Sequence, residues 1–166
     1  MKKDAARTAD GISLGFGIVL MAALGLRLWL AQDLPLWLDE SWTGMIATQP
    51  DWNSFWREAW LDCNPPFYYV VMAVWTGIMG ASDIALRAPS FLFIILAAMV
   101  PLVMSAPGVG RKARWAFAVL VALWQPGFEI SLDARGYSLL LCLSVVLSGL
   151  VQAAERPRVA RSCSLI

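Results

Sequence analysis

Two adjacent carboxylates, Asp39 and Glu40, are the first residues of the chain whose types and spacing could carry chemistry. They follow a long apolar segment and lie in a stretch that is rich in Trp. Carboxylates at the edge of a membrane are costly where they touch lipid, so such a pair more often faces water or a functional cleft. The simpler interpretation is that both residues cap a helix beginning at Ser41, where negative charge suits the helix dipole.

Two further polar islands interrupt the apolar sequence. Residues 64–69 read Asn-Pro-Pro-Phe-Tyr-Tyr and are followed by Arg87, and residues 133–137 read Asp-Ala-Arg-Gly-Tyr. Arg suits phosphate and carboxylate groups because its planar guanidinium donates paired hydrogen bonds. The alternative for Arg87 and Arg135 is that they anchor helix starts at the membrane surface.

The composition indicates an integral membrane protein. The 166-residue chain is 59% hydrophobic and 15% charged, whereas soluble domains average roughly 25% charged residues, and its apolar residues fall in long blocks. A net charge of +1 and the lack of a basic stripe argue against a nucleic-acid partner. The absence of His excludes a Ser-His-Asp triad and a His-ligated zinc site within this chain.

We predict an all-α, polytopic transmembrane protein with about four spans and amphipathic juxtamembrane helices in its first extracytoplasmic loop. The expected segments are a cytoplasmic tail at 1–10, a span at 11–31, the loop at 33–87, spans at 88–106, 115–130 and 136–154, and a cytoplasmic tail at 155–166. Near the outer end of the first span, Arg27 is expected to extend its charge to the membrane surface, with a phosphate contact as the alternative.

Within the loop, the sequence predicts an amphipathic helix that begins after Pro50-Asp51. Its apolar positions recur at helical spacing: Trp52, Phe55, Trp56, Ala59 and Trp60. The Trp residues favour the bilayer interface, and packing against other protein is the alternative. Pro65-Pro66 ends this helix and opens an apolar stretch to about residue 79, which is short for a membrane span.

The distribution of basic residues predicts that this short stretch does not cross the membrane. If it did, the basic turn at 111–114 and the basic tail would both lie outside, against the positive-inside rule. If it returns to the outer face, both basic segments are cytoplasmic. Asp39, Arg87 and Arg135 then share the outer rim of the inner (plasma) membrane.

The order and spacing of the polar islands resemble the N-terminal module of GT-C class membrane glycosyltransferases, in particular the protein O-mannosyltransferase, aminoarabinose transferase and galacturonosyltransferase relatives. Asp39-Glu40 matches the acidic pair of that family's first loop, and residues 64–69 match a "PPLYY"-like stretch. Residues 85–90 match an "ALRLPS"-like span start, and residues 133–139 an "EARMYAL"-like segment with Asp133 in place of Glu. The resemblance covers roughly residues 20–155. Family members are several times longer, so it implies that this chain is the N-terminal part of a larger enzyme.

The resemblance implies a glycosyltransferase that moves a sugar, with inversion, from a polyprenyl-phosphate-linked donor to an extracytoplasmic acceptor. It implies that Asp39 is the general base or orients the acceptor, with Glu40 supporting it. Arg87 and Arg135 become phosphate or carboxylate partners, and Asp133 a second acidic or metal-associated group. Tyr68 and Tyr137 are expected to line the cleft.

The residues also fit this chemistry on their own. Transfer from a polyprenyl-phosphate sugar needs a base for the acceptor and cations for the departing phosphate. A carboxylate at the rim could instead hold a divalent metal ion, the one cofactor expected. The expected partners are the lipid-linked donor and membrane lipid. The alternative is a non-catalytic membrane protein, either a transporter subunit or an assembly partner, and a transporter should carry its charges in mid-span.

Overall fold

The chain is all-α over the residues described, which confirms the all-α part of the predicted fold class. The structure, a computed structural model, describes residues 2–31, 35–104, 109–123 and 133–163. These ranges form seven helices: α1 (Lys2–Ala31), α2 (Leu38–Ala47), α3 (Trp52–Leu61), α4 (Pro66–Met79), α5 (Asp83–Val103), α6 (Arg111–Leu123) and α8 (Tyr137–Cys163).

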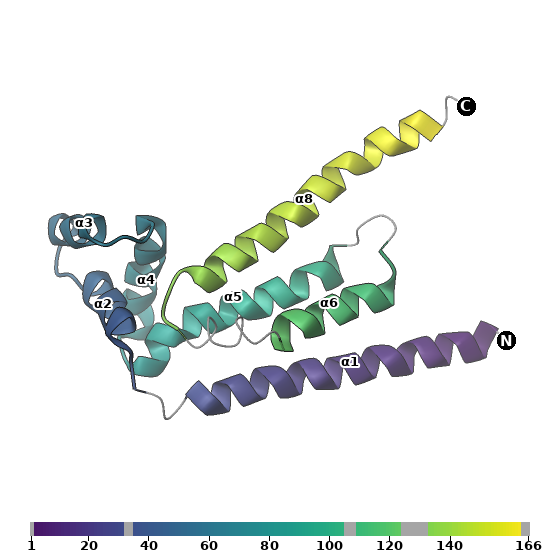
Figure 1. Ribbon diagram of the computed structural model, residues 1–166, viewed down its shortest axis with the longest axis horizontal. Helices are drawn as coiled ribbons and strands as arrows, with labels where there is room; N and C mark the ends of the chain where they lie inside the picture. Colours follow the sequence, from purple (N-terminus) through teal and green to yellow (C-terminus); the bar gives the residue numbers. More distant parts are fainter. Residues whose placement is uncertain (1, 32–34, 105–108, 124–132, 164–166) are drawn as a thin grey trace.

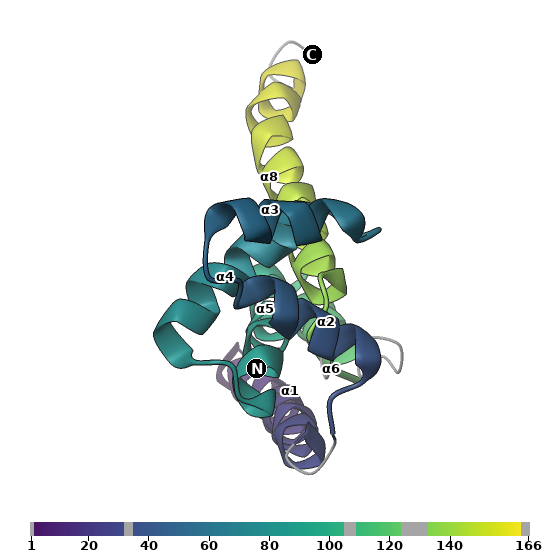
Figure 2. The same cartoon turned by 90° about the vertical axis from the view of Figure 1, so that its left-hand side faces the viewer.

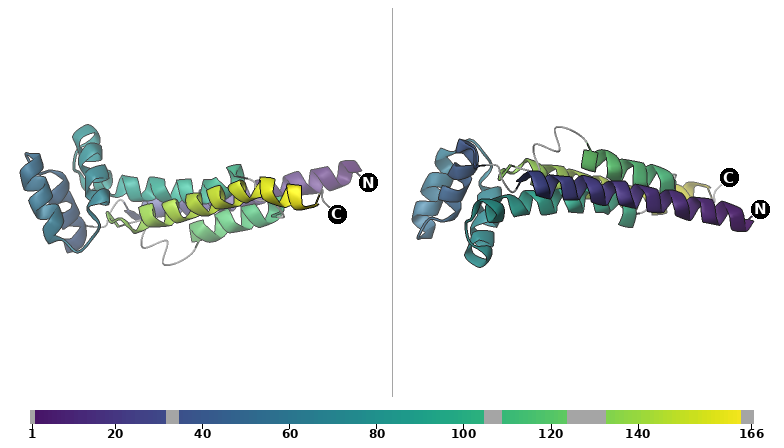
Figure 3. Two further views of the ribbon diagram at one scale, coloured as in Figure 1. Left: turned by 90° about the horizontal axis from the view of Figure 1, so that it is seen from above. Right: turned by 90° about the horizontal axis from the view of Figure 1, so that it is seen from below.

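The helices form an elongated bundle with a group of short helices at one end. α5 packs against α6 and α8, and α6 packs against α1. The short helices α2, α3 and α4 gather at one end of these four, whereas α1 begins and α8 ends at the opposite end (Figures 1 and 3). Viewed from the side of the short helices, α2 and α3 lie across the bundle (Figure 2).

Small residues allow the long helices to approach one another closely. Ala97 and Ala98 of α5 and Ala118 and Ala122 of α6 are all buried in the core of the bundle. Interfaces of this kind are typical of helices that pack in membranes, where small side chains bring backbones together. Large apolar side chains face outward instead: Leu92, Leu96, Met99, Leu143, Leu147 and Leu150.

Two stretches, Asp83–Val103 and Tyr137–Ala154, are long and apolar enough to cross a membrane, judged by length and composition alone. Leu14–Arg27 and Pro66–Met79 are apolar but shorter, and α6 has 13 residues. Residues 105–106 and 124–130 of the predicted spans lie outside the described residues. Two of the four predicted spans therefore meet this criterion.

Local signals place the starts of α3 and α4 where the sequence predicts them. Asp51 caps α3, because its carboxylate accepts hydrogen bonds from the backbone N–H groups of Asn53 and Ser54 at 2.9 and 3.0 Å. α4 begins at Pro66, a first-turn position that tolerates proline. Gly80 follows α4 with φ of 80°, a conformation that favours glycine, and turns the chain toward α5.

Three helices extend beyond the predicted boundaries. α5 begins at Asp83 rather than at residue 88, because the Ser82 hydroxyl accepts a hydrogen bond from the Ala85 N–H at 3.3 Å. α1 takes up most of the predicted 1–10 tail, and α8 continues past residue 154. The apolar blocks indicate where the chain could meet lipid, and a helix need not end where its apolar block ends.

The short helices share a second core with the start of α5 and the start of α8, and this core includes Ile46, Phe55, Tyr69, Met72 and Leu86. The predicted apolar stripe of α3 is only partly buried in this core. Its Phe55 and Ala59 are buried, as the alternative of packing against protein expects, whereas all three Trp side chains of the helix stay exposed.

Candidate functional site

The first turn of α2 sends its two carboxylates in different directions. The helix begins at Leu38 and not at Ser41, so both acids lie inside it. Successive residues of an α-helix are rotated by about 100°. The Asp39 side chain is 63% exposed, and the Glu40 side chain is 1% exposed.

Glu40 accepts hydrogen bonds from four N–H groups. Arg87 donates through Nε at 2.8 Å and through Nη2 at 2.6 Å, and the backbone N–H groups of Trp37 and Ala134 each donate at 2.9 Å. The Arg87 side chain is itself only 5% exposed, and it also donates to the Pro35 carbonyl at 2.9 Å. We call Glu40, Arg87 and the two backbone N–H groups the Glu40 network.

The Glu40 network keeps a buried carboxylate ionised. Burial by itself would raise the pKa of Glu40, but the hydrogen bonds from Arg87, Trp37 and Ala134 and the charge of Arg87 together hold it below its ordinary value. The bond from Trp37 is also a helix-capping interaction. The capping interpretation of the acidic pair therefore holds for Glu40, which joins α2, α5 and the segment before α8.

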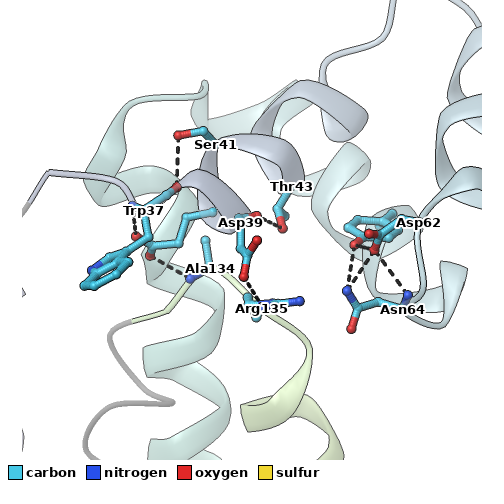
Figure 4. A network of polar contacts seen from close by, with 10 residues as sticks. Trp37, Asp39, Ser41, Thr43, Asp62, Asn64, Ala134 and Arg135 are labelled. Carbon is cyan, nitrogen blue, oxygen red and sulfur yellow. Dashed lines mark hydrogen bonds and ion pairs between the residues drawn. The ribbon is translucent and has the colours of Figure 1, made fainter.

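Asp39 meets Arg135 at the surface beside this network. The distance from Arg135 Nη1 to Asp39 Oδ2 is 2.5 Å, and Figure 4 shows the two side chains pointing toward each other from α2 and from the segment before α8. The Arg135 guanidinium also lies over the Tyr137 ring, 5.3 Å from its centroid, a favourable cation–π arrangement. An exposed carboxylate and a partly exposed cation thus share one small surface.

The backbone of this segment rests on α4 and α5. The Ser90 hydroxyl donates to the Arg135 carbonyl at 3.2 Å and lies 3.3 Å from the Tyr68 hydroxyl. A Cβ at Gly136 would lie 3.3 Å from both Cβ and Cγ of Tyr68, a tight contact that favours glycine at this position. The signal for Ser90 in the sequence is its place at the start of an apolar span, but its contact with Arg135 is not predictable from it.

Tyr68 supports the site from below and does not line an open cleft. Its side chain is buried, and this burial, which outweighs the hydrogen bond with Ser90, raises the pKa of Tyr68 to about 12. Tyr68 therefore stays protonated at neutral pH. Tyr137 is exposed, and the Asp133 carbonyl accepts a hydrogen bond from the Arg135 N–H at 2.8 Å within the turn.

A second polar cluster lies between α3 and α4. It joins Asn64 and Tyr69 of the predicted 64–69 island to Asp62, which the sequence does not single out. The Asp62 carboxylate accepts hydrogen bonds from the Tyr69 hydroxyl and, at 2.8 Å, from Asn64 Nδ2 (Figure 4). Burial would raise the pKa of Asp62, but these hydrogen bonds lower it below its ordinary value. The cluster stabilises the link that leads into the Pro-Pro start of α4.

Arg27 is not at the membrane surface, and the prediction that it extends its charge there is wrong. Its side chain is fully buried, and its Nε donates to the Ala122 carbonyl of α6 at 3.1 Å. Carbonyl groups in the last turn of a helix attract cations. Arg27 therefore binds the end of α6 to α1.

The acidic residues at the site do not fit a divalent metal ion. In the part of the chain that the structure describes, no group of three or more Cys, Asp and Glu residues is placed to hold one. The Glu40 oxygens are occupied by four N–H donors, and Asp39 faces the Arg135 cation. We therefore derive no step that passes through a metal.

The structure thus brings the predicted site residues to one end of the bundle and sorts them into two layers. Asp39, Arg135 and Tyr137 are on the surface, whereas Glu40, Arg87 and Tyr68 are buried beneath them. Comparison of the chain with protein-family models, with curated proteins and with solved structures finds no match.

Proposed function

We propose that this chain belongs to a membrane glycosyltransferase of the GT-C class, which moves a sugar from a polyprenyl-phosphate donor to an extracytoplasmic acceptor. The observation that carries the proposal is the exposed Asp39–Arg135 pair, held over a buried ionic network at one end of a bundle of apolar helices. A carboxylate base beside a guanidinium is the combination that this transfer needs.

In the proposed reaction, Asp39 accepts the proton of the acceptor hydroxyl while the hydroxyl oxygen attacks C1 of the sugar. The bond from C1 to the phosphate oxygen breaks, and its electron pair leaves with the phosphate. Arg135 donates hydrogen bonds to this phosphate and stabilises its negative charge. One such displacement inverts C1 and yields the glycosylated acceptor and the polyprenyl phosphate.

The pairing of Asp39 with Arg135 describes the site before the donor binds. A phosphate that approaches Arg135 competes with Asp39 for the guanidinium. Binding of the donor thereby frees the Asp39 carboxylate for the acceptor hydroxyl. Of the remaining predicted residues, Tyr137 holds the Arg135 side chain, and Asp133 is the second acidic group beside the phosphate.

Glu40 and Arg87 act as positioning residues in this proposal, because both side chains are buried beneath the surface that carries Asp39 and Arg135. Through the Ala134 N–H, Glu40 holds the residue next to Arg135. Through its place in the first turn of α2, it also fixes the position of its neighbour Asp39. The Glu40 network therefore sets the distance between base and cation, and a small displacement of such groups lowers rates strongly.

The proposed topology has four spans, formed by α1, α5, α6 with the residues that follow it, and α8, and it places the end that carries α2, α3 and α4 outside the cytoplasm. Two observations support it. α4 packs with α2 at the end of the bundle and does not run along it (Figure 1). The cations of residues 111–114 lie at the opposite end, as the positive-inside rule requires of a cytoplasmic end.

The test measures sugar transfer in native membranes that carry Asp39→Asn. Asp39 lies inside α2 and forms only an exposed ion pair, so insertion and fold should be retained, while loss of the base should lower transfer by at least roughly a hundredfold. Asp51→Asn is the matched control, because it makes the same change at an exposed carboxylate that caps α3. Equal transfer by the two variants would refute the role of Asp39 as the base.

A further inference from the structure

A groove of about 700 Å³ lies at the end of the bundle opposite to the Asp39–Arg135 pair. It runs between the end of α5, the start of α6 and the middle of α8, where α5 and α8 diverge (Figure 1). Its volume is in the range of roughly 300–1,000 Å³ that is typical of sites for small molecules. Most of its wall is apolar, including Val100, Val103, Met104, Phe117 and Val145.

One cation, Arg114, lines this apolar groove. Among the residues that the structure describes, its buried Nε has no hydrogen-bond partner, and its Nη1 reaches the Leu102 carbonyl only at 3.5 Å. A buried N–H of a charged group that lacks an acceptor is costly. An anion in the groove would supply that acceptor.

The charges around Arg114 favour an anion as well. Arg111 and Lys112 are exposed beside it, and the first turn of α6 contains no acidic residue. Cations in the first turn of a helix oppose its dipole. A negative group placed there is therefore attracted by the backbone N–H groups and by the side chains together.

We propose that this groove binds an anionic phospholipid, with an acyl chain along its apolar wall and the phosphate on Arg114. The chemistry of the groove matches such a molecule, which is apolar along its length and negative at one end. Ser148 and Gln152 add polar groups to the lining, for the ester region of the lipid. The proposal does not depend on the transferase activity.

The position of the groove distinguishes a phospholipid from the polyprenyl-phosphate donor. The phosphate of the donor must reach Arg135, at the end of the bundle where α5 begins. Arg114 lies where α5 ends, and a helix of 21 residues is about 30 Å long. A phosphate on Arg114 is therefore far from the reaction and belongs to a lipid with a different function, that of stabilising the basic end of the bundle.

The test measures lipid binding to the purified chain in detergent by native mass spectrometry. The probes are phosphatidylglycerol and phosphatidylcholine with identical acyl chains. We expect a preference for phosphatidylglycerol, and we expect Arg114→Gln to weaken its binding about tenfold, the effect of losing a charge-assisted hydrogen bond. The control for charge is Arg57→Gln, which removes an exposed cation of α3 at the other end of the molecule.

A second variant fills the groove. Within the described part of the chain, the Ser148 hydroxyl donates to the Ser144 carbonyl of its own helix, α8, so Ser148→Phe adds volume without breaking a hydrogen bond between described helices. It should displace the bound phospholipid, whereas Leu147→Phe, on an exposed face of α8, should not. Far-UV circular dichroism and gel filtration check that each variant is folded, and if Ser148→Phe is not, the two Arg variants decide.

Two results would overturn the proposal. One is equal affinity of Arg114→Gln and Arg57→Gln for phosphatidylglycerol. The other is one-for-one displacement of phosphatidylglycerol by a polyprenyl phosphate, which would assign the groove to the donor. Neither result bears on Asp39→Asn, whose loss of transfer tests the proposed function separately.

Discussion

Arg135 donates a hydrogen bond to Asp39 across 96 positions of sequence, with 2.5 Å between Nη1 and Oδ2. Because Asp39 is largely exposed, this ion pair is screened by water and contributes little to stability. The neighbouring Glu40–Arg87 pair is buried, and breaking it should destabilise the fold strongly. Substitutions in the Asp39–Arg135 pair should therefore change activity with little effect on stability, whereas substitutions in the Glu40–Arg87 pair should lower stability.

Arg135→Gln should leave the thermal unfolding midpoint in detergent almost unchanged, since exposed ion pairs contribute about 0–1 kcal/mol. It should weaken the binding of a polyprenyl phosphate by about tenfold or more, because a charged donor to the phosphate is lost. Arg57→Gln breaks a comparable exposed pair with Glu58 and should change neither quantity. Unchanged binding by Arg135→Gln would remove Arg135 from the proposed phosphate site.

Glu40→Gln should lower the free energy of unfolding by about 3–5 kcal/mol, because it removes the buried carboxylate charge that faces Arg87. The double variant Glu40→Leu/Arg87→Met should recover part of this loss, since it replaces both charges of the pair. Chemical unfolding in detergent, followed by circular dichroism, measures the stability of both variants. A double variant that is no more stable than Glu40→Gln would contradict the coupling of the two residues.

Acid should destabilise the protein through Glu40. Its pKa in the folded protein is lowered from 4.5, so the unfolded chain binds the proton more readily. The stability from this group is fully present above pH 4.5 and is lost as the pH falls through the lowered pKa. The unfolding midpoint of the wild type should therefore decrease below that pH more steeply than that of Glu40→Gln. Arg57→Gln, which leaves the Glu40 network intact, should follow the wild type.

Membrane-impermeant thiol reagents on intact cells should distinguish the two ends of the bundle. Variants that retain one cysteine each, at Cys63, Ala113→Cys or Tyr137→Cys, place it at exposed positions of the α3–α4 link, α6 and the start of α8. The first and third should be labelled, and the second should be labelled only after the cells are permeabilised. Labelling of Ala113→Cys in intact cells, with Tyr137→Cys protected, would contradict the proposed topology.

Gly136→Ala should disturb the segment that carries Arg135. Its added Cβ would lie 3.3 Å from atoms of Tyr68 that are close to the α4 backbone and have little room to move. We expect a loss of about 1 kcal/mol in stability, the lower end of the usual cost of overpacking. Gly77→Ala in α4 is the matched control, because its Cβ meets no atom within 4 Å and should stabilise the helix slightly.

The sequence predicts the helices more successfully than it predicts which side chains are buried. Asp51, Pro66 and Gly80 act through the local backbone, so α3 and α4 follow from nearby residues. The polar islands converge at one end of the bundle, which is the arrangement that the positive-inside rule predicts for them. The sequence does not predict that Glu40 is buried and Asp39 exposed. Neighbouring residues of a helix face different directions, and only a distant partner decides which one is buried.

The burial of Arg27 in the bundle is likewise not predictable from the residues around it. An Arg near the end of an apolar block ordinarily extends to the membrane surface. Here the carbonyl of Ala122 in α6 lies beside it and accepts its hydrogen bond. No local pattern around residue 27 contains that information, because the acceptor lies 95 positions away.

The contacts of the Glu40 network also form in a fixed order as the chain is synthesised. Glu40 leaves the ribosome 94 residues before Ala134, which at typical elongation rates is a delay of about 5–20 s. During that interval Arg87 emerges and can neutralise the carboxylate, but the last N–H donor does not yet exist. The surface that carries Asp39 and Arg135 is therefore completed only when the segment before α8 has been synthesised. A nascent chain stalled before residue 134 would contain Asp39 without Arg135.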